Sequence, residues 1–535
     1  MSVYQISLND IRERQHRAFE SGDRRALREC RGMLEQWLTG QPKNWAVMFY
    51  LGANYLAENR HAIARLIFEE AVRLNPNAGE AYNNIGICHR AGHHVDLARE
   101  AFTRSAELQP NDPTTWNNLA TLCVNEGCPE DGLGYLAKSL ELHPGQREAH
   151  WNRALCLLEM ERWGEGWDEY SWGMVTKDRL CKTFGRAEWW QGQFDKERSI
   201  VVYGEQGIGD EIMFASQIKG LKGKFKEVII DCHPRLVTLF KSSFDWATVY
   251  GTRKEIHDEP AWVAEHAPKW KAPMGMLGKH LTRREADFAR TPYLRVPTKY
   301  VAAAKARLHT AAPLIGISWV GGYQKTRKDL RHVPLDQWRP IFEAGKAAGA
   351  EFVSMQYTGH EEQAKAAAEA FGVTIHLLPE IVESKKWERY YPLDADGMRI
   401  KDDKGEDYWT NEKLVAKDIS LQHGGSGKLD FKPPRNGFNY AQTAGLVRHI
   451  GETGGVIVSI NTSLVHLCGA MGQKALVLTP SRPAWRYGLA RTDMIWYSKD
   501  SIRQFRQLEG EEWTVPISRV ATAVAEHFSP TARDG

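Results

Sequence analysis

Prolines recur at a fixed interval in the first third of the chain, and this spacing restricts the fold more than any other feature. Pro42, Pro76, Pro110 and Pro144 are each 34 residues apart. On this interval, residues 45–78, 79–112, 113–146 and 147–180 form four units. The eighth and the twentieth positions of each unit are small, namely Gly52, Gly86, Ala120 and Ala154, and Ala64, Ala98, Gly132 and Gly166. Small residues at two fixed positions predict a closely packed pair of antiparallel helices in every unit.

A helix pair repeated every 34 residues is typical of tetratricopeptide repeats. We therefore expect an α-solenoid over residues 44–180, preceded by flanking helices within residues 1–43 that cover the first repeat. Such an array buries the faces between neighbouring repeats and leaves a concave groove, whose usual ligand is a peptide or protein segment.

Asparagines recur in register on the expected inner helices of this array. They are Asn83, Asn84, Asn117, Asn118 and Asn152. Their side-chain amides can hydrogen-bond an extended peptide backbone with little demand on its sequence, so we expect them to bind the acceptor peptide. The alternative is that they are ordinary solvated polar positions.

The last repeat lacks its closing proline and is rich in aromatic residues. These are Trp151, Trp163, Trp167, Tyr170 and Trp172. We favour a hydrophobic joint between the solenoid and the following domain over a platform on which a ligand stacks.

Composition limits the remaining possibilities. A length of 535 residues indicates more than one domain, and a net charge of +3 implies neither a nucleic-acid-binding field nor an acidic tail. The eight cysteines are scattered without metal-ligand spacing, which favours buried thiols in a reducing compartment. The N-terminus has no leader pattern and no apolar run reaches membrane-spanning length. These features predict a soluble, cytoplasmic protein.

After residue 185, apolar strand-like runs alternate with helical segments, which predicts an α/β domain with parallel sheets. The run Ser199–Tyr203 ends in glycines at 204, 207 and 209, and Asp210 then opens a segment with helical apolar spacing. A strand, a glycine-rich turn and a helix start can offer backbone N–H groups to a substrate while a carboxylate points at it. The alternative is an ordinary strand-to-helix turn with a capping aspartate.

A second stretch of the same kind lies far downstream. The strand-like run 454–460 leads into Asn461-Thr-Ser-Leu-Val-His466, and a further strand-like run follows at 474–479. Together the two stretches resemble the C-terminal catalytic domain of bacterial tetratricopeptide-repeat proteins related to the ADP-heptose:lipopolysaccharide heptosyltransferases. The resemblance covers residues 185–510. It implies a GT-B fold of two Rossmann-like halves, at 185–300 on the acceptor side and at 301–520 on the nucleotide-sugar side, with an insertion at 381–436.

The resemblance also implies roles for single residues. Asp210 would be the catalytic base, and the donor would be held near the two glycine-bearing stretches and the loop after the strand-like run 313–319. The donor-binding candidates are Gly207, Gly209, Ser318, Lys325, Arg327, Gln356, Asn461, Thr462, Ser463, Leu464, His466, Trp485 and Arg486. The family usually has Asp where this chain has Asn461, which removes any role that needs negative charge there but keeps a neutral hydrogen bond. Glu205 and Glu211 flank Asp210 and remain alternative bases.

The implied reaction is inverting transfer of a sugar from a nucleotide sugar to an acceptor hydroxyl, with no metal and no cofactor beyond the co-substrate. The repeats suggest a protein acceptor, as in flagellin-modifying enzymes of similar layout. The insertion is either a surface excursion, which we favour, or an acceptor-binding flap carrying Trp387, Tyr390, Tyr391 and Trp409.

Two other functions stay open. The chain could be an adaptor whose glycosyltransferase-like domain is catalytically idle, a reading that Asn461 supports. It could also transfer sugar onto a glycan, onto lipopolysaccharide or onto modified nucleic-acid bases, the last of which the near-neutral charge disfavours.

Overall fold

The structure is a computed structural model, and it divides into two compact units, Met1–Asp178 and Arg179–Gly535. The residues that it describes are 7–252, 260–321, 328–356, 360–378, 389–395, 398, 400, 420–422, 429–432 and 439–529.

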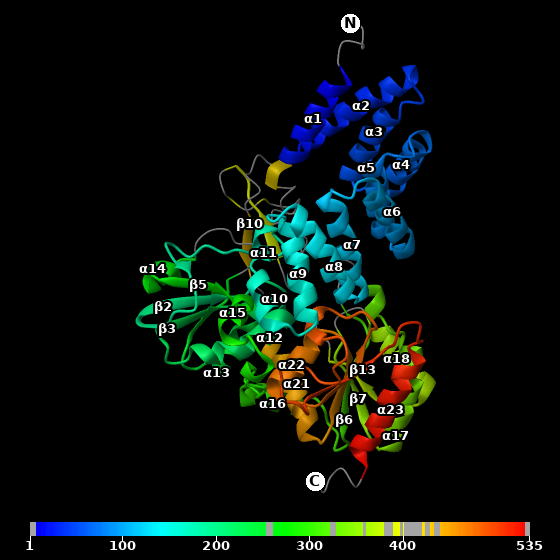
Figure 1. Cartoon of the computed structure of the whole chain (residues 1–535). Helices are drawn as coiled ribbons and strands as arrows, with labels where there is room; N and C mark the ends of the chain where they lie inside the picture. Colours follow the sequence, from blue (N-terminus) through cyan, green and yellow to red (C-terminus); the bar gives the residue numbers. More distant parts are fainter. Residues whose placement is uncertain are drawn as a thin grey trace. The chain divides into compact units, whose positions relative to one another are not determined.

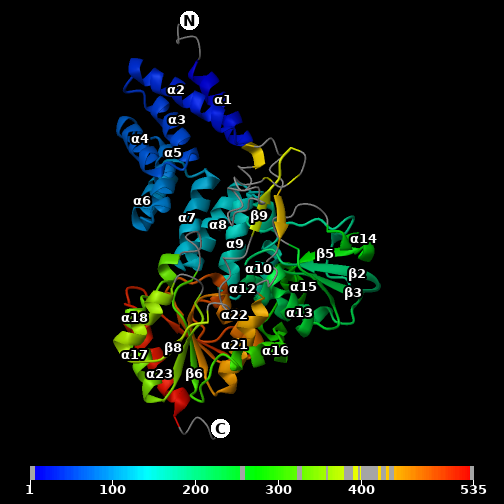
Figure 2. The ribbon, with the colours of Figure 1, turned by 180° about the vertical axis from the view of Figure 1, so that it is seen from behind.

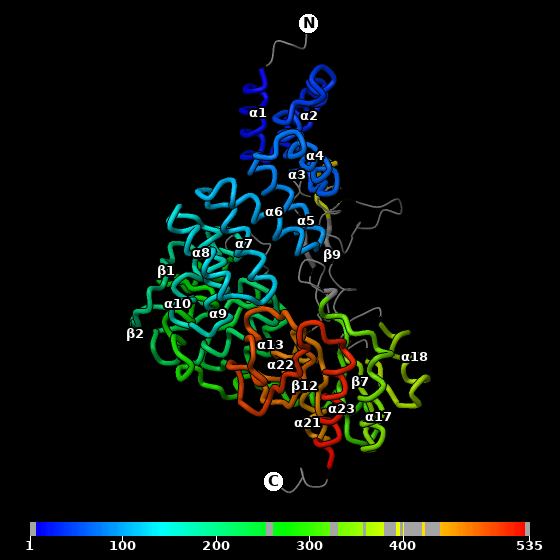
Figure 3. Tube along the Cα trace, turned by 45° about the vertical axis from the view of Figure 1, so that its right-hand side comes forward, coloured from blue at the N-terminus to red at the C-terminus, as the bar shows by residue number. Residues whose placement is uncertain are grey.

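The first unit is built of helices that follow one another in antiparallel pairs (Figure 1). They are α1 (Leu8–Ser21), α2 (Arg24–Gly40), α3 (Trp45–Ala57), α4 (His61–Leu74), α5 (Gly79–Ala91), α6 (Val95–Leu108), α7 (Pro113–Glu126), α8 (Pro129–Leu142), α9 (Arg147–Glu159), α10 (Trp163–Glu169) and α11 (Trp172–Val175). The first helix of each repeat begins at residue 45, 79, 113 or 147, where the 34-residue interval places it. Figure 3 shows the trace passing from one pair to the next.

The small residues act as predicted. A Cβ atom on Gly52 would lie 2.7 Å from the Phe68 ring, and one on Gly86 would lie 2.6 Å from the Phe102 ring. Both rings are fully buried, so the paired helices approach too closely for a side chain at the eighth position. The repeat prediction is confirmed.

The aromatic residues of the last repeat are packed together. Trp163, Trp167 and Tyr170 are buried, and the Tyr170 ring lies 5.2 Å from the rings of both Trp151 and Trp167. Burial of this kind makes three of the five rings part of a core, which leaves them unsuited to stacking on a ligand.

The second unit contains two parallel sheets. The first has the order β1-β5-β2-β3-β4, and its neighbouring strands are all parallel. Its strands are β1 (Glu188–Trp189), β2 (Asp195–Tyr203), β3 (Phe225–Asp231), β4 (Thr248–Tyr250) and β5 (Trp270–Pro273), and its helices are α12 (Ile208–Phe214), α13 (Val237–Ser243), α14 (Trp262–His266) and α15 (Gly278–Leu281).

The second sheet has the order β13-β12-β11-β6-β7-β8, again all parallel. Its strands are β6 (Leu314–Ser318), β7 (Glu351–Ser354), β8 (Ile375–His376), β11 (Val456–Ile460), β12 (Ala475–Thr479) and β13 (Ile502–Arg506). The chain starts at the centre with β6, moves outward to β8, and returns to lay β11 on the other side of β6. This is the strand order of dinucleotide-binding sheets, in which ligands bind at the carboxyl ends of the two central strands.

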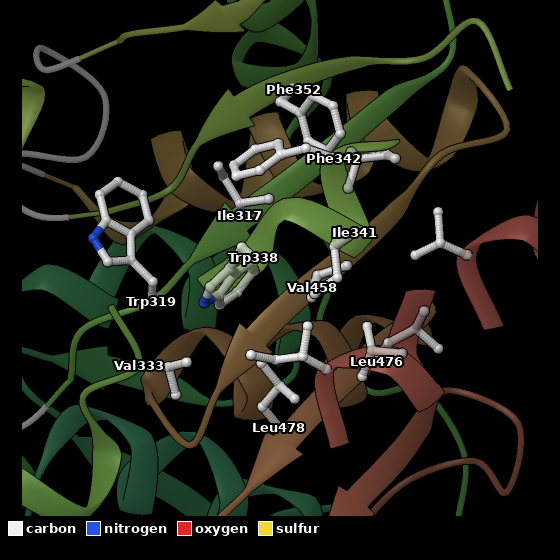
Figure 4. Packing of buried hydrophobic residues seen from close by; sticks show 14 of the residues in the cluster. Ile317, Trp319, Val333, Trp338, Ile341, Phe342, Phe352, Val458, Leu476 and Leu478 are labelled. Atoms are coloured by element: carbon white, nitrogen blue, oxygen red, sulfur yellow. The ribbon is translucent and has the colours of Figure 1, made fainter. Parts of the chain in front are cut away.

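Helices cover both faces of this second sheet (Figure 2). One layer is formed by α17 (Arg339–Ala347), α18 (Glu361–Phe371) and α23 (Thr514–Phe528), and the other by α21 (Tyr440–Glu452) and α22 (Ser463–Met471). α16 (Thr298–Lys305) packs on α21. Figure 4 shows the core under the first layer, where Trp338, Phe342 and Phe352 are fully buried against Val458 and Leu478. The prediction of parallel sheets in the C-terminal region is confirmed.

Most of the expected insertion at 381–436 lies outside the described residues, and so do Trp387 and Trp409. The part of it that is described includes two antiparallel strands, β9 (Arg389–Pro392) and β10 (Leu429–Lys432). Tyr390 and Tyr391 belong to β9, but their side chains are outside the described part of the chain. The flap hypothesis is therefore untested.

Candidate functional site

The turn after β2 is shaped by a buried carboxylate. A Cβ atom on Gly204 would lie 2.1 Å from the carboxyl carbon of Glu211, so only glycine fits there. Glu211 is buried, and its carboxylate accepts a hydrogen bond from the backbone N–H of His233 at 2.7 Å. Glu211 thus holds the turn against the next strand and is not placed to meet a substrate.

Glu205 has a similar structural task. Its carboxylate accepts hydrogen bonds from Nε and Nη2 of Arg179 at 2.7 and 2.6 Å and from the backbone N–H of Gly275 at 3.0 Å. The side chains of Arg179 and Glu205 are 0% and 1% exposed. A carboxylate with three donors inside the protein is a structural anchor, so Asp210 remains the best placed of the three acids.

Asp210 lies in the first turn of α12, where a carboxylate complements the helix dipole. One of its oxygens accepts a hydrogen bond from the backbone N–H of Gly207 at 3.2 Å, and the other contacts Nη2 of Arg486 at 2.5 Å. The Asp210 side chain is 18% exposed and the Arg486 side chain 20%, so the pair is partly open to solvent.

The two glycine-bearing stretches meet at Gly209. A Cβ atom there would lie 3.0 Å from the His466 ring and 3.3 Å from the Cα atom of Ser463. α12 therefore crosses the start of α22 at close range, as the contacts between these two helices also show (Figure 1). Segments about 250 residues apart in the sequence thus form one place in the second unit.

The start of α22 uses most of its own polar groups. The Thr462 hydroxyl accepts a hydrogen bond from the Leu464 N–H at 3.3 Å, and the Ser463 hydroxyl accepts one from the Tyr440 hydroxyl at 2.9 Å. Asn461 is 1% exposed, and its Oδ1 accepts a hydrogen bond from the Thr479 hydroxyl at 3.2 Å. Its Nδ2 has no hydrogen-bond partner within the described part of the chain.

His466 is held between two tyrosines. Its Nδ1 lies 2.7 Å from the Tyr497 hydroxyl and its Nε2 lies 3.2 Å from the Tyr487 hydroxyl. Burial, together with the nearby positive charge of Arg486, lowers the pKa of His466 to about 3. A neutral ring with both nitrogens engaged can position Tyr487 and α22, but it does not offer a free donor to a phosphate.

Ser318 and Gln356 lie at the ends of β6 and β7. Oε1 of Gln356 accepts hydrogen bonds from the backbone N–H groups of Trp319 and Val320 at 3.1 and 3.0 Å, and its Nε2 donates to the Val320 carbonyl at 2.7 Å. The Ser318 hydroxyl lies 3.3 Å from the same Oε1. The Gln356 amide thus fastens the end of β6, which leaves little of it for a donor.

The loop after β6 contains the two expected phosphate ligands Lys325 and Arg327, both of which are outside the described residues. Arg331, which the sequence reasoning passed over, is described. Its Nη1 donates a hydrogen bond to the backbone oxygen of Asn461 at 3.3 Å. Burial lowers the pKa of Arg331, and the charges of Arg486 and Asp210 act on it. Its position at the end of the basic run 325–331 was the available signal.

Trp485 lies beside Arg486 but is 9% exposed. Its ring lies 6.5 Å from that of Phe214 and 6.1 Å from that of Trp496. These rings pack the end of α12 against the segment after β12, so Trp485 joins the two halves of the second unit and has little surface left for a nucleotide base.

The asparagines of the repeats form bonds with one another. Nδ2 of Asn118 donates to Oδ1 of Asn83, and Nδ2 of Asn152 donates to Oδ1 of Asn117, both at 2.9 Å. Asn117, Asn118 and Asn152 are buried, whereas Asn83 and Asn84 are half-buried. The amides thus link α5 to α7 and α7 to α9, and the description of them as merely solvated positions is wrong.

Two searches of the described residues gave no candidate. No group of three His, Cys, Asp or Glu side chains there lies close enough together to hold a metal ion. Within the same ranges, none of the helices combines the length and apolar character needed to cross a membrane.

A family profile described as tetratricopeptide repeat matches residues 51–113. The N-terminal region contains tetratricopeptide repeats. These repeats also account for the likeness to the peroxisomal targeting signal receptor of Saccharomyces cerevisiae, which is 33% identical over 76 residues, 14% of this chain and 12% of the receptor.

A second curated relative matches more of the chain. Protein FlbA of Caulobacter vibrioides is 26% identical over 354 residues, which is 61% of this chain and 57% of FlbA. Because 61% of 535 residues exceeds the 178 residues of the first unit, this likeness extends into the second unit. The chain spans little more than half the length of FlbA.

Solved structures resemble the repeats only distantly. A crystal structure of MamA is 16% identical with a TM-score of 0.27, covering 32% of this chain and 95% of that one. YrrB, titled a TPR protein with an unusual peptide-binding site, is 19% identical with a TM-score of 0.25, covering 28% of this chain and 84% of that one. Scores this low support no statement about function.

Proposed function

We propose that this protein transfers a sugar from a nucleotide-sugar donor to a hydroxyl group of a protein bound by its repeats. The observation that carries the proposal is the meeting of Asp210 with Arg486 beside the start of α22. It places a carboxylate, a guanidinium and a helix N-terminus at the carboxyl ends of strands from two parallel sheets. Two such sheets with a ligand between them are what a GT-B glycosyltransferase has, and the resemblance of the sequence to that family supports the same fold.

Each group suits one part of the reaction. The acceptor oxygen forms a bond to the anomeric carbon while the bond from that carbon to the diphosphate oxygen breaks. The hydroxyl proton passes to the Asp210 carboxylate, and the electron pair of the broken bond leaves with the diphosphate. One direct displacement inverts the anomeric carbon.

Positive charge must stabilise the departing diphosphate. Arg486 is the described cation nearest to Asp210, and the N–H groups at the start of α22 add the positive end of a helix dipole. Lys325 and Arg327 remain predicted ligands of the donor. Because arginine and lysine side chains supply this charge, the proposal calls for no metal ion.

The repeats supply the acceptor site in this proposal. The amides of Asn83, Asn84 and Asn117 retain donor or acceptor positions that the bonds among the asparagines do not use, and these can pair with an extended peptide backbone. The name of the yeast relative, a targeting signal receptor, supports a peptide or protein ligand for repeats of this type.

A protein-binding adaptor is the second candidate, and two observations favour it. The Asp210 carboxylate is already paired with Arg486, and Asn461 stands where the glycosyltransferase family usually has Asp. In this case the repeats carry the whole function and the second unit has lost its chemistry.

One experiment separates the two candidates. The full-length protein is incubated with a panel of nucleotide sugars and a cell extract, and release of nucleoside diphosphate is measured together with the mass of labelled proteins. The enzyme proposal expects both signals, and it expects Asp210→Asn to abolish them while Glu509→Gln, a change at an exposed ion pair, preserves them. Binding of protein partners without any nucleotide release, or full transfer by Asp210→Asn, would reject it.

A further inference from the structure

The charges around Asp210 do not balance. Arg486 contacts its carboxylate at 2.5 Å, and Arg331 lies near enough for the charges of both Asp210 and Arg486 to act on it. One carboxylate therefore faces two guanidinium groups, and the nearby His466 stays neutral because burial lowers its pKa to about 3. This part of the protein holds an excess of positive charge.

The two arginines come from opposite sides of the same strand end. Arg331 follows β6 and donates a hydrogen bond to the backbone oxygen of Asn461, the residue between β11 and α22. Arg486 follows β12, which is the neighbour of β11 on its other side. Both guanidinium groups thus flank the place where β11 gives way to α22, which is where a parallel sheet of this strand order binds phosphate.

Arginine keeps its charge when it is partly buried, and its planar fork matches phosphate oxygens two at a time. A diphosphate carries more negative charge than one carboxylate and presents more acceptors. It can therefore compete with Asp210 for Arg486 while it also engages Arg331.

We propose that Arg331 and Arg486 form the binding site for the diphosphate of a nucleoside-diphosphate donor, and that the diphosphate takes Arg486 away from Asp210. This rests on the proposed function for its consequence, which is that the base becomes available only after the donor has bound. Asp210 is then both the proton acceptor and a competitor of the donor for Arg486.

The competition predicts a sign that a simple base does not. Asp210→Asn removes the competing charge, so it should tighten diphosphate binding about three- to tenfold while it abolishes transfer. Arg331→Met and Arg486→Met should each weaken binding at least tenfold. Arg331→Lys and Arg486→Lys keep the charge but lose the fork, and should weaken binding by a smaller factor.

The exposed pair Arg482–Glu509 offers matched controls, because it has the same chemistry at the same 2.5 Å separation on the surface. Arg482→Met and Glu509→Gln should change binding less than twofold. The test is calorimetric titration of the full-length protein with UDP, ADP, GDP, CDP, TDP and inorganic pyrophosphate, with circular dichroism to confirm that each variant folds. Asp210→Asn and the lysine variants keep the test valid if a methionine variant fails to fold.

The outcomes separate this inference from the proposed function. Tighter binding to Asp210→Asn and weaker binding to the arginine variants support the diphosphate site, whether or not the wild-type protein transfers sugar. Unchanged or weaker binding to Asp210→Asn overturns the exchange. Absence of diphosphate binding to the wild-type protein, or equal binding by the arginine variants in an enzyme that transfers sugar, overturns the site while the latter result leaves the enzyme proposal standing.

Discussion

Removal of Arg179 tests whether a buried ion pair holds the turn that carries Asp210. Glu205 receives two hydrogen bonds from Arg179 and one from the backbone of Gly275, at 2.6 to 3.0 Å. Neither side chain of the pair is more than 1% exposed. Arg179→Met would leave the Glu205 carboxylate buried with a single donor.

The expected cost follows from this burial. Breaking a buried ion pair by removing one partner costs about 3–5 kcal/mol, because a charge is left without compensation. Removing one partner of an exposed pair costs about 0.2–1 kcal/mol. The double variant Arg179→Met, Glu205→Leu removes both charges, so it should cost clearly less than the sum of its single changes, with a coupling of about 2 kcal/mol or more.

Because the chain has two units, its global unfolding need not be two-state, and a local measurement is needed. Hydrogen exchange of the backbone amides in residues 199–214 measures the free energy of opening of this turn in the full-length protein. Arg284→Met is the matched control, since the Arg284 side chain is 81% exposed and pairs with Asp287 in the same unit.

A loss of less than 1 kcal/mol in Arg179→Met, equal to that of the control, would refute the reasoning. Additive costs in the double variant would refute it as well. Sugar transfer that depends on Glu205 in a variant whose turn remains folded would show that Glu205, and not Asp210, is the base.

Three further changes test other parts of the structure. Burial and the charge of Arg486 lower the pKa of His466 from 6.5 to about 3, so the unfolded chain takes up this proton first as the pH falls. The free energy of unfolding should therefore drop below about pH 6.5 by roughly 1.4 kcal/mol per pH unit, a slope that denaturant titrations should find reduced in His466→Gln. Asn152→Ala leaves Oδ1 of Asn117 without its donor and should lower the thermal stability of the repeats by about 1–2 kcal/mol. Gly209→Ala forces α12 away from α22 and should cost about 1–3 kcal/mol in urea unfolding, whereas Gly134→Ala, with open space around it, should cost nothing.

The repeats could be predicted because their signal is local and periodic. The close approach of Gly52 to Phe68 involves residues of one helix pair, so spacing in the sequence translates directly into contact in space. The central strands β2, β6 and β11 were also visible, since strands covered on both faces are continuously apolar.

Strands at or near the edges escaped the sequence reasoning. β13 carries two arginines and a glutamine among its five residues, and β4, β5 and β8 have only two to four residues each. Short or polar strands gain their stability from pairing with a neighbour already in place. Their own sequences therefore carry little of the pattern that would identify them.

The candidate site was predicted in part. The glycine turns bring Asp210 and the start of α22 together, as the resemblance of the sequence led us to expect. The partners of the site residues were not foreseen: Glu205 is anchored by Arg179, Gln356 by the backbone at the end of β6, and His466 by two tyrosines. These partners are chosen by tertiary packing across tens to more than a hundred residues, which no local pattern records.

Asn461 can now be judged by its surroundings and not only by its departure from the family. Its buried Oδ1 accepts a hydrogen bond from Thr479, and its backbone oxygen accepts one from Arg331. An aspartate in its place would add a second buried carboxylate next to a cation that the diphosphate needs, and would cancel the excess positive charge that Arg331 and Arg486 provide over Asp210. A neutral amide preserves that excess. The replacement of Asp by Asn at this position is therefore compatible with a site that attracts an anion, and by itself it does not argue that the second unit is idle.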